Sequence, residues 1–393
     1  MSPKPSWKRA ASKIRSSAAE VRDAGAGTFS DAMFVADESF VPTSHKGLTY
    51  PFGHPVIEAD QPFAVVPGLR LVRLTVPGPL KHINCWLIDD HDDRGAGVAL
   101  VDTGMNLPDA RAAWKALAKG ALAGERITRV IGTHFHPDHI GLAGWMCAHH
   151  DCPLVMTRGE WLTARMLSAD ARDTVPDEMT AFWRAGGWDD AQVAHGTSRG
   201  WSGFRRIITP MPLSYQRIAD GDTLMIGGRP WRIVTGSGHS PEHACLLDEE
   251  RGILISGDQV LPRISSNVSL GVTEPNADPL GEWLDSIAKL KHLPHNLLVL
   301  PGHGDAFTGL HVRLDALDRE HRDRLDELAV FIAEAPRRAV DCFGRLFRRA
   351  IGPEVLGMAT GEALAHLRRL EVEGRAVKDV IDGVWWYRAP NRG

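Results

Sequence analysis

The stretch that decides the fold is Thr133-His134-Phe135-His136-Pro137-Asp138-His139-Ile140-Gly141. It follows the short apolar run 129–132, which is typical of a buried strand. Residues two apart on a strand point to the same side, so we expect His134 and His136 to bind one ion together. The proline breaks the strand, and the aspartate and histidine beyond it can face a second ion. The stretch therefore predicts a metal site where a strand ends, which is where α/β folds carry their chemistry.

Three later segments each place one further candidate ligand beside a glycine. They are Gly238-His239-Ser240, Ser256-Gly257-Asp258 and Pro301-Gly302-His303-Gly304. Each follows an apolar run that is typical of a buried strand. We therefore expect these side chains to meet the histidine-rich stretch at one edge of the folded protein.

The order of these residues resembles that of the metallo-β-lactamase superfamily of hydrolases: His-x-His-x-Asp-His, then His, Asp and His. The resemblance covers residues 63–310 and implies a mixed α/β fold, the four-layer αββα sandwich, with two metal ions at one edge. The ligands that it implies are His134, His136 and His239 for one ion, Asp138, His139 and His303 for the other, and Asp258 for both. Zinc β-lactamases carry a cysteine where this chain has Asp258. The resemblance is therefore to the glyoxalase II, thioesterase, lactonase and nuclease branches rather than to antibiotic hydrolysis.

The chemistry expected of such a site is hydrolysis. Two divalent ions share a water molecule and lower its pKa toward neutrality, so that a metal-bridging hydroxide attacks the substrate. Asp138 and Asp258 are the expected catalytic carboxylates. Zinc is the expected metal, and iron or manganese would also suit histidine and aspartate ligands. Asp102, at the end of the apolar run 98–101, is predicted to orient a metal-binding histidine, with helix capping as the alternative.

The expected substrate is a small molecule with a thioester, lactone or other ester bond. An insertion at 159–215 is rich in aromatic residues and methionine, and we expect it either to wall an apolar acyl pocket or to bury itself against the body of the protein. Arg263, Ser266 and Asn267 are candidate substrate contacts, with hydrogen bonding to their own loop as the alternative. His243 is predicted to support the site or to lie at the surface.

Residues 311–393 are predicted to form a C-terminal domain. A long charged helix over 310–335 precedes two helical segments, 339–351 and 360–373, and a hairpin that turns at Asp382-Gly383. This order resembles the winged-helix appendage of one branch of the superfamily, which includes thioester hydrolases and an endoribonuclease. A phosphodiesterase or nuclease that binds RNA through the winged helix is therefore the alternative function, and a non-catalytic binding module is the third.

Composition limits the partners and the location. The formal net charge is −4 over 393 residues, and the C-terminal segment is only weakly basic, so nucleic acid is not the expected partner. Five scattered cysteines favour a reducing compartment, and a cytoplasmic location is expected. The chain has no long apolar run and no secretory signal, so we expect no membrane contact.

The ends of the chain complete the predicted organisation. Residues 1–62 are expected to be an N-terminal extension with a short helix at 7–23, and residues 63–310 to be the catalytic domain. The charged helix and the wing favour a homodimer.

Overall fold

The computed structural model of the chain describes residues 40–391. The helix that the sequence predicts at 7–23 lies outside the described residues. The described part of the N-terminal extension carries a hairpin of β1 (Thr43–His45) and β2 (Leu48–Tyr50), which reaches the backbone of Thr308 through Thr49. No helix of the described residues has the length and apolar character that crossing a bilayer requires.

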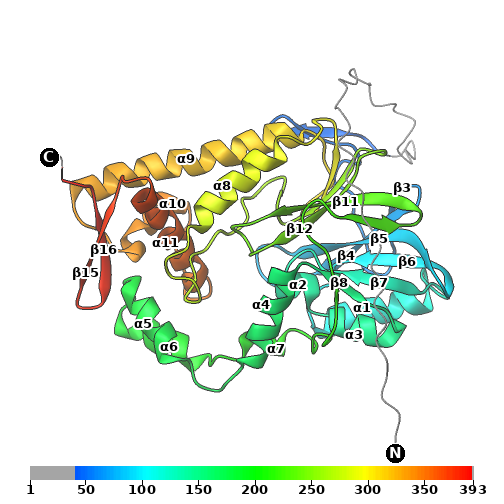
Figure 1. The fold of residues 1–393 in the computed structure, drawn as a ribbon, viewed down its shortest axis with the longest axis horizontal. Coiled ribbons are helices and arrows are strands. Elements are labelled where there is room, and N and C mark those ends of the chain that lie inside the picture. The colour runs from blue at the N-terminus through cyan, green and yellow to red at the C-terminus, as the bar shows by residue number, and fades with distance from the viewer. Residues whose placement is uncertain (1–39, 392–393) are drawn as a thin grey trace, which may run out of the picture. The chain divides into compact units, whose positions relative to one another are not determined.

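Two β-sheets face each other and enclose a shared apolar core (Figure 1). The first sheet holds β3 (Phe63–Val66), β4 (Leu69–Thr75), β5 (His82–Asp92), β6 (Gly95–Val101), β7 (Ile127–Ile131), β8 (Leu154–Met156) and β9 (Gln216–Arg217) in that order. The second holds β10 (Thr223–Ile226), β11 (Arg229–Gly236), β12 (His243–Asp248), β13 (Ile253–Gly257) and β14 (Leu298–Pro301). Pairing is antiparallel from β3 to β6 and from β10 to β13, and parallel elsewhere.

Apolar residues alternate between the two faces of each sheet, and this alternation produces the layers. In β4, Leu71 packs into the core between the sheets, whereas Val72 packs under α1 (Pro108–Lys119) and α3 (Ala143–His150). The outer face of the second sheet is covered by α8 (Pro279–Leu290) and by the C-terminal helices. The fold is therefore the αββα sandwich that the sequence predicts.

One predicted helix begins three residues later than expected, and a short helix that was not predicted precedes it. The sequence predicts a helix over 140–149, but the chain forms α2 (Pro137–Ile140) and then α3. Between them, the Leu142 N–H donates to Gly104 O at 3.0 Å and so leaves the helical pattern. Because α2 begins with a proline, which suits a first turn, Asp138 and His139 lie on a helical turn rather than on an open loop.

The insertion forms four helices, and three of its seven aromatic residues are buried. These helices are α4 (Arg158–Ala169), α5 (Asp177–Ala185), α6 (Asp190–Ser198) and α7 (Gly203–Arg206). Phe182, Trp183 and Trp188 join the core of the C-terminal helices, and Trp188 Nε1 donates to Thr360 Oγ1 at 2.8 Å. Burial against the body of the protein is therefore correct for these three side chains.

The C-terminal segment contains helices and then a hairpin. Its elements are α9 (Leu310–Glu334), the 3₁₀ helix η2 (Ala339–Cys342), α10 (Phe343–Leu346), α11 (Leu356–Val372), β15 (Val377–Ile381) and β16 (Val384–Arg388). The charge pattern of α9 predicts a solvated surface, but the helix also has an apolar face, on which residues such as Leu314, Leu317 and Leu325 are buried. The winged-helix interpretation and the boundary at residue 310 stay predictions.

Candidate metal centre

The predicted metal ligands lie together at one edge of the two sheets. They follow β7 in the first sheet and β11, β13 and β14 in the second. Their ligand atoms form three groups, each within 4.8 Å: His134, His136 and His239; His134, His139 and Asp258; Asp138, His139 and His303. Each polar side chain begins where an apolar strand ends, so the packing of the sheets brings them to the same place.

The first group consists of three histidines whose ring nitrogens converge. His134 Nε2 lies 2.8 Å from His136 Nδ1, and His136 Nδ1 lies 3.1 Å from His239 Nε2. The remaining distance, between His239 Nε2 and His134 Nε2, is 3.3 Å. Three nitrogens directed at one point are the donor set that zinc and similar ions prefer.

The second group, as the term is used below, is Asp138, His139 and His303, and it contains a carboxylate as well as histidines. Asp138 Oδ2 lies 3.2 Å from His303 Nε2 and 3.9 Å from His139 Nε2. Asp258 Oδ1 lies 3.4 Å from His139 Nε2, and its Oδ2 lies 3.7 Å from His239 Nε2. The Asp258 carboxylate therefore stands between the two groups, where the sequence predicts a bridging ligand.

Hydrogen bonding leaves the converging atoms available. Among the described residues, His139 Nε2, His303 Nε2 and Asp258 Oδ1 are buried and have no hydrogen-bond partner. The opposite ring nitrogens do have partners: His139 Nδ1 lies 2.7 Å from Asp102 Oδ2, His239 Nδ1 2.7 Å from Asn267 O, and His303 Nδ1 2.5 Å from His82 O. Metal-binding histidines characteristically donate their second N–H to an oxygen in this way. The side chains present therefore fit a pair of divalent cations.

The electrostatic environment differs between the two groups. Burial lowers the pKa of His136 to about 3 and that of His134 well below its usual range, which keeps both rings in the neutral form that binds metals. Burial alone would also lower the pKa of His303, but Asp258 and Asp138 raise it to about 10. The carboxylate side of the centre thus favours positive charge, which a divalent cation supplies.

Asp102 connects β6 to the histidine-rich stretch. Its Oδ1 accepts from the Thr133 N–H at 2.9 Å, and its Oδ2 accepts from Thr133 Oγ1 at 2.8 Å and faces His139 Nδ1. The residue has a φ of 60°, a left-handed conformation that is uncommon outside glycine. These contacts occupy both oxygens of the Asp102 carboxylate. The observed position therefore favours the predicted role of Asp102 in orienting His139 over a role as a helix cap.

Two glycines allow the close approach of the ligand segments. A Cβ on Gly302 would lie 2.4 Å from Asp258 Oδ1 and 2.8 Å from His139 Cε1. Gly257 has a φ of 47°, and a Cβ there would lie 2.6 Å from His243 Nε2. A larger side chain at either position would push the ligand-bearing loops apart.

Sequence reasoning did not assign roles to Glu160 or His82, and it left His243 undecided. His243 is buried, so the surface interpretation is wrong: its Nε2 accepts from the Asp258 N–H at 3.0 Å. Glu160 is fully buried and accepts from the Phe135 N–H at 2.9 Å and from Ser240 Oγ at 2.7 Å. It thus links the loops that carry the first group. Nothing in the local sequence marks these residues, because each contact joins distant segments.

The three candidate substrate contacts differ in position. Ser266 is buried, and its hydroxyl donates to the Asp258 carbonyl. Asn267 accepts from His239 through its carbonyl and donates Nδ2 to Glu362 Oε2 at 2.9 Å. Arg263 is exposed and lies 3.0 Å from His54 Nε2. Ser266 and Asn267 thus hold the site together, and contact of any of the three with substrate stays a prediction.

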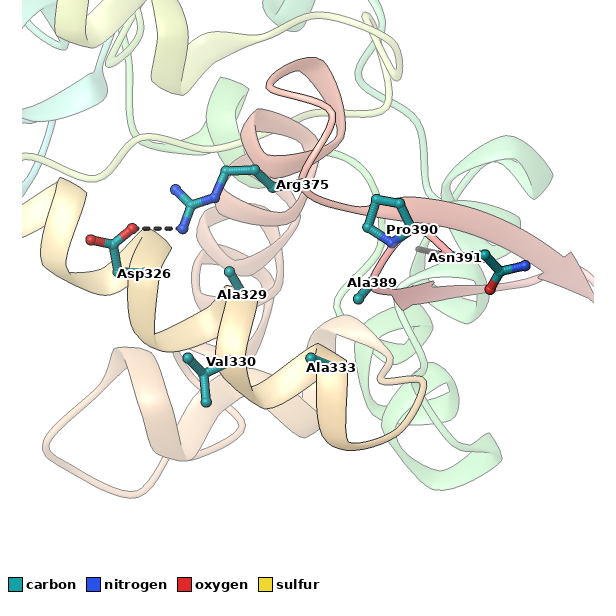
Figure 2. Close-up of a pocket in the computed structure, with 8 residues that line it drawn as sticks. All are labelled: Asp326, Ala329, Val330, Ala333, Arg375, Ala389, Pro390 and Asn391. Atoms are coloured by element: carbon teal, nitrogen blue, oxygen red, sulfur yellow. Dashed lines mark hydrogen bonds and ion pairs between the residues drawn. The ribbon is translucent and has the colours of Figure 1, made fainter. Parts of the chain in front are cut away.

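A surface hollow of about 600 Å³ lies elsewhere, between α9 and the residues that follow β16 (Figure 2). Its lining residues are Asp326, Ala329, Val330, Ala333, Arg375, Ala389, Pro390 and Asn391. The charged pair in it is satisfied, since Arg375 Nη2 lies 2.6 Å from Asp326 Oδ1. These residues offer no convergent unpartnered group, so the hollow is not the candidate active site.

Comparison with known proteins gives matches over both parts of the chain. Residues 78–303 match the family described as the metallo-beta-lactamase superfamily, and residues 325–390 match one described as the metallo-beta-lactamase-like C-terminal domain. A solved beta-lactamase domain protein from Burkholderia ambifaria is 37% identical, with a TM-score of 0.76 over 87% of this chain and 99% of that chain.

Several relatives have names that state an activity, and among them are thioesterases that match more than half of this chain. An acyl-coenzyme A thioesterase from Gallus gallus is 30% identical over 57% of this chain and 73% of its own length. An atrochrysone carboxyl ACP thioesterase from Aspergillus fumigatus is 26% identical over 72% of this chain and 71% of its own length.

Proposed function

The chain belongs to the metallo-beta-lactamase superfamily of hydrolases, and we propose that it cleaves the thioester bond of a small acyl substrate, with two divalent cations at the candidate metal centre. The observation that carries the metal assignment is that three buried ligand atoms without a hydrogen-bond partner, His139 Nε2, His303 Nε2 and Asp258 Oδ1, belong to groups whose ligand atoms lie within 4.8 Å of one another. When bound, the cations would polarise the substrate carbonyl and lower the pKa of a water molecule.

The residues of the chain have separate tasks in this proposal. His134, His136 and His239 hold one cation, and Asp138, His139 and His303 hold the other. Asp258 contacts both groups and keeps the cations close together. Asp102 keeps the His139 ring in the tautomer that has its proton on Nδ1, so that Nε2 can bind a cation.

The choice of a thioester rests on the relatives and on Asp258. Two relatives are named as thioesterases, one for acyl-coenzyme A and one for an acyl carrier protein. An aspartate at position 258, where antibiotic-hydrolysing zinc enzymes have a cysteine, favours the thioesterase, lactonase and nuclease branches over antibiotic hydrolysis, and the two named relatives then favour a thioester.

The acyl chain of the substrate would lie along α4. Leu162 and Met166 are one turn apart on this helix and are 52% and 45% exposed. The helix begins beside the His239 loop, because Thr157 Oγ1 donates to Glu242 O at 2.7 Å. These two side chains, rather than the buried tryptophans of the insertion, offer an exposed apolar surface on the helix that begins beside this loop.

The test begins with protein purified without added metal and elemental analysis of its metal content. The same preparation is then assayed with acyl-coenzyme A thioesters, acyl-pantetheine thioesters, lactones and a phosphodiester. We expect thioester hydrolysis that a chelator abolishes and that added Zn²⁺, Mn²⁺ or Fe²⁺ restores. A metal-loaded enzyme that hydrolyses only the lactones or the phosphodiester would contradict the thioester assignment.

A further inference from the structure

The loop that leaves Asp258 is fixed by the C-terminal helices. This loop, residues 258–270 and called the Asp258 loop below, ends with the Leu270 N–H donating to Gly361 O of α11 at 3.0 Å. Arg313 of α9 is buried and donates to Leu261 O at 2.6 Å and to Ile264 O at 2.7 Å. The Asp258 loop is therefore attached to two of the C-terminal helices, α9 and α11.

One residue of the loop contacts the candidate ligand His239, at the ring nitrogen that points away from the other ligands. The Asn267 carbonyl faces His239 Nδ1 at 2.7 Å and so accepts its proton. This bond fixes the rotation of the imidazole and leaves Nε2, the nitrogen that faces His136, without a proton. The position of the Asn267 backbone therefore decides where the third nitrogen of the first group lies.

Asn267 is itself held by a carboxylate from α11. Its Nδ2 donates to Glu362 Oε2 at 2.9 Å, and its Oδ1 accepts from Ser269 Oγ at 2.5 Å. Glu362 also pairs with Arg324 at 3.4 Å, and Arg324 has a second carboxylate partner, Glu320, at 2.7 Å. Glu362 is thus the group that connects the C-terminal helices to the support of His239.

We propose that Glu362 is a positioning residue for His239, so that the C-terminal helices set the cation affinity of the centre. The proposal rests on the proposed function, because it takes His239 as a metal ligand. Substitutions behind metal-binding histidines typically lower metal affinity by about 10- to 100-fold. Glu362 acts one contact further away, and we expect Glu362→Ala to weaken cation binding by about 10-fold, the lower end of that range.

The experiment measures cation binding to the full chain without any substrate. Co²⁺ is titrated against a chelator, and its visible absorption spectrum is recorded for wild type, Glu362→Ala, Glu362→Gln and Asn267→Ala. Glu362→Gln keeps an oxygen that can accept from Asn267, so we expect it to restore most of the affinity. Glu362→Ala and Asn267→Ala should lower the affinity of one Co²⁺ and change its spectrum.

The matched control is Glu320→Ala, which removes the other partner of Arg324 but does not reach Asn267. We expect it to bind Co²⁺ as the wild type does. A double variant, Glu362→Ala with Asn267→Ala, should be no weaker than the worse single variant, because both changes break one contact. Thermal unfolding of each metal-free variant shows whether it is folded.

Three results would overturn the proposal. The first is a Glu362→Ala variant with the Co²⁺ affinity and spectrum of the wild type. The second is an equal loss of Co²⁺ affinity in Glu362→Ala and Glu320→Ala. The third is a loss of affinity in the double variant that equals the sum of the two single losses. The proposed function fails separately, through a wild-type protein that binds Co²⁺ but hydrolyses no thioester. A wild-type protein that binds no Co²⁺ would overturn both.

Discussion

Two clusters of buried histidines in the described residues, 40–391, differ in what their ring nitrogens face. At the candidate metal centre, the histidine nitrogens and carboxylate oxygens of each ligand group lie within 4.8 Å of one another. In the C-terminal helices, His321 and His366 are equally buried, with His321 Nδ1 3.3 Å from His366 Nε2. Their other nitrogens face Ser265 Oγ at 3.2 Å and Glu362 O at 2.8 Å.

The difference shows what separates a metal site from a structural cluster. Every ring nitrogen of the second cluster has a protein partner, and burial lowers the pKa of His366 to about 4, which keeps the ring neutral. At the first cluster, protein partners occupy the outer ring nitrogens of His139, His239 and His303. Burial of histidines alone is therefore a poor sign of metal binding, whereas convergence of unpartnered donors with carboxylates is a good one.

The largest expected effect comes from removing the shared carboxylate of the first cluster. Asp258→Ala should abolish retention of at least one cation and remove about 4 kcal/mol of transition-state stabilisation, roughly a thousandfold in rate. Thioester turnover and elemental analysis measure the two losses. A variant that holds two cations and turns over at the wild-type rate would contradict the assignment of Asp258.

A smaller loss of cation affinity is expected from a substitution at Asp102, which contacts the candidate ligand His139. Asp102→Asn keeps the size of the side chain, but its amide can present N–H to His139 Nδ1 or to the Thr133 N–H, where both now find oxygen. We expect cation affinity to fall by about 10- to 100-fold. Competition with a chelator measures the cation affinity of the variant. Unchanged affinity would show that His139 does not depend on this carboxylate for its orientation.

Substitutions in the second cluster should change the free energy of unfolding rather than the binding of cations. His321→Leu leaves His366 Nε2 without its partner, and we expect unfolding to become easier by about 1–3 kcal/mol in urea. The double variant His321→Leu with His366→Leu should lose less than the sum of the single losses, because both partners are removed together. The number of cations bound per chain should stay the same. Loss of a cation from His321→Leu would remove the distinction between the clusters.

The smallest effect is expected on the exposed face of α9, next to the second cluster. Arg322 Nε donates to Asp318 Oδ1 at 3.0 Å, and the arginine side chain is 60% exposed. Because water screens this pair, Arg322→Ala should cost about 0.3–0.5 kcal/mol or less in urea unfolding. A loss as large as that of His321→Leu would mean that stability on this helix does not follow burial.

Much of the architecture could be read from local patterns. A Gly-Gly pair at 227–228 and an Asp-Gly pair at 382–383, each between two apolar runs, predict hairpin turns, and all four residues have the positive φ that such turns need. Apolar runs that end in a histidine or an aspartate predicted both the strands and the edge where these side chains meet. The assignment of each residue to a particular cation stays a prediction.

The sequence by itself determined the strand ends, the order of the seven candidate ligands and the family, because short apolar runs and residue spacing are local properties. Only the tertiary structure decided which groups stand behind the ligands. His303 meets the backbone of His82, 221 residues away, and Asn267 meets Glu362, 95 residues away. A polar side chain can form hydrogen bonds with many different groups. Its actual partner is determined only when packing of the apolar faces brings distant segments into contact.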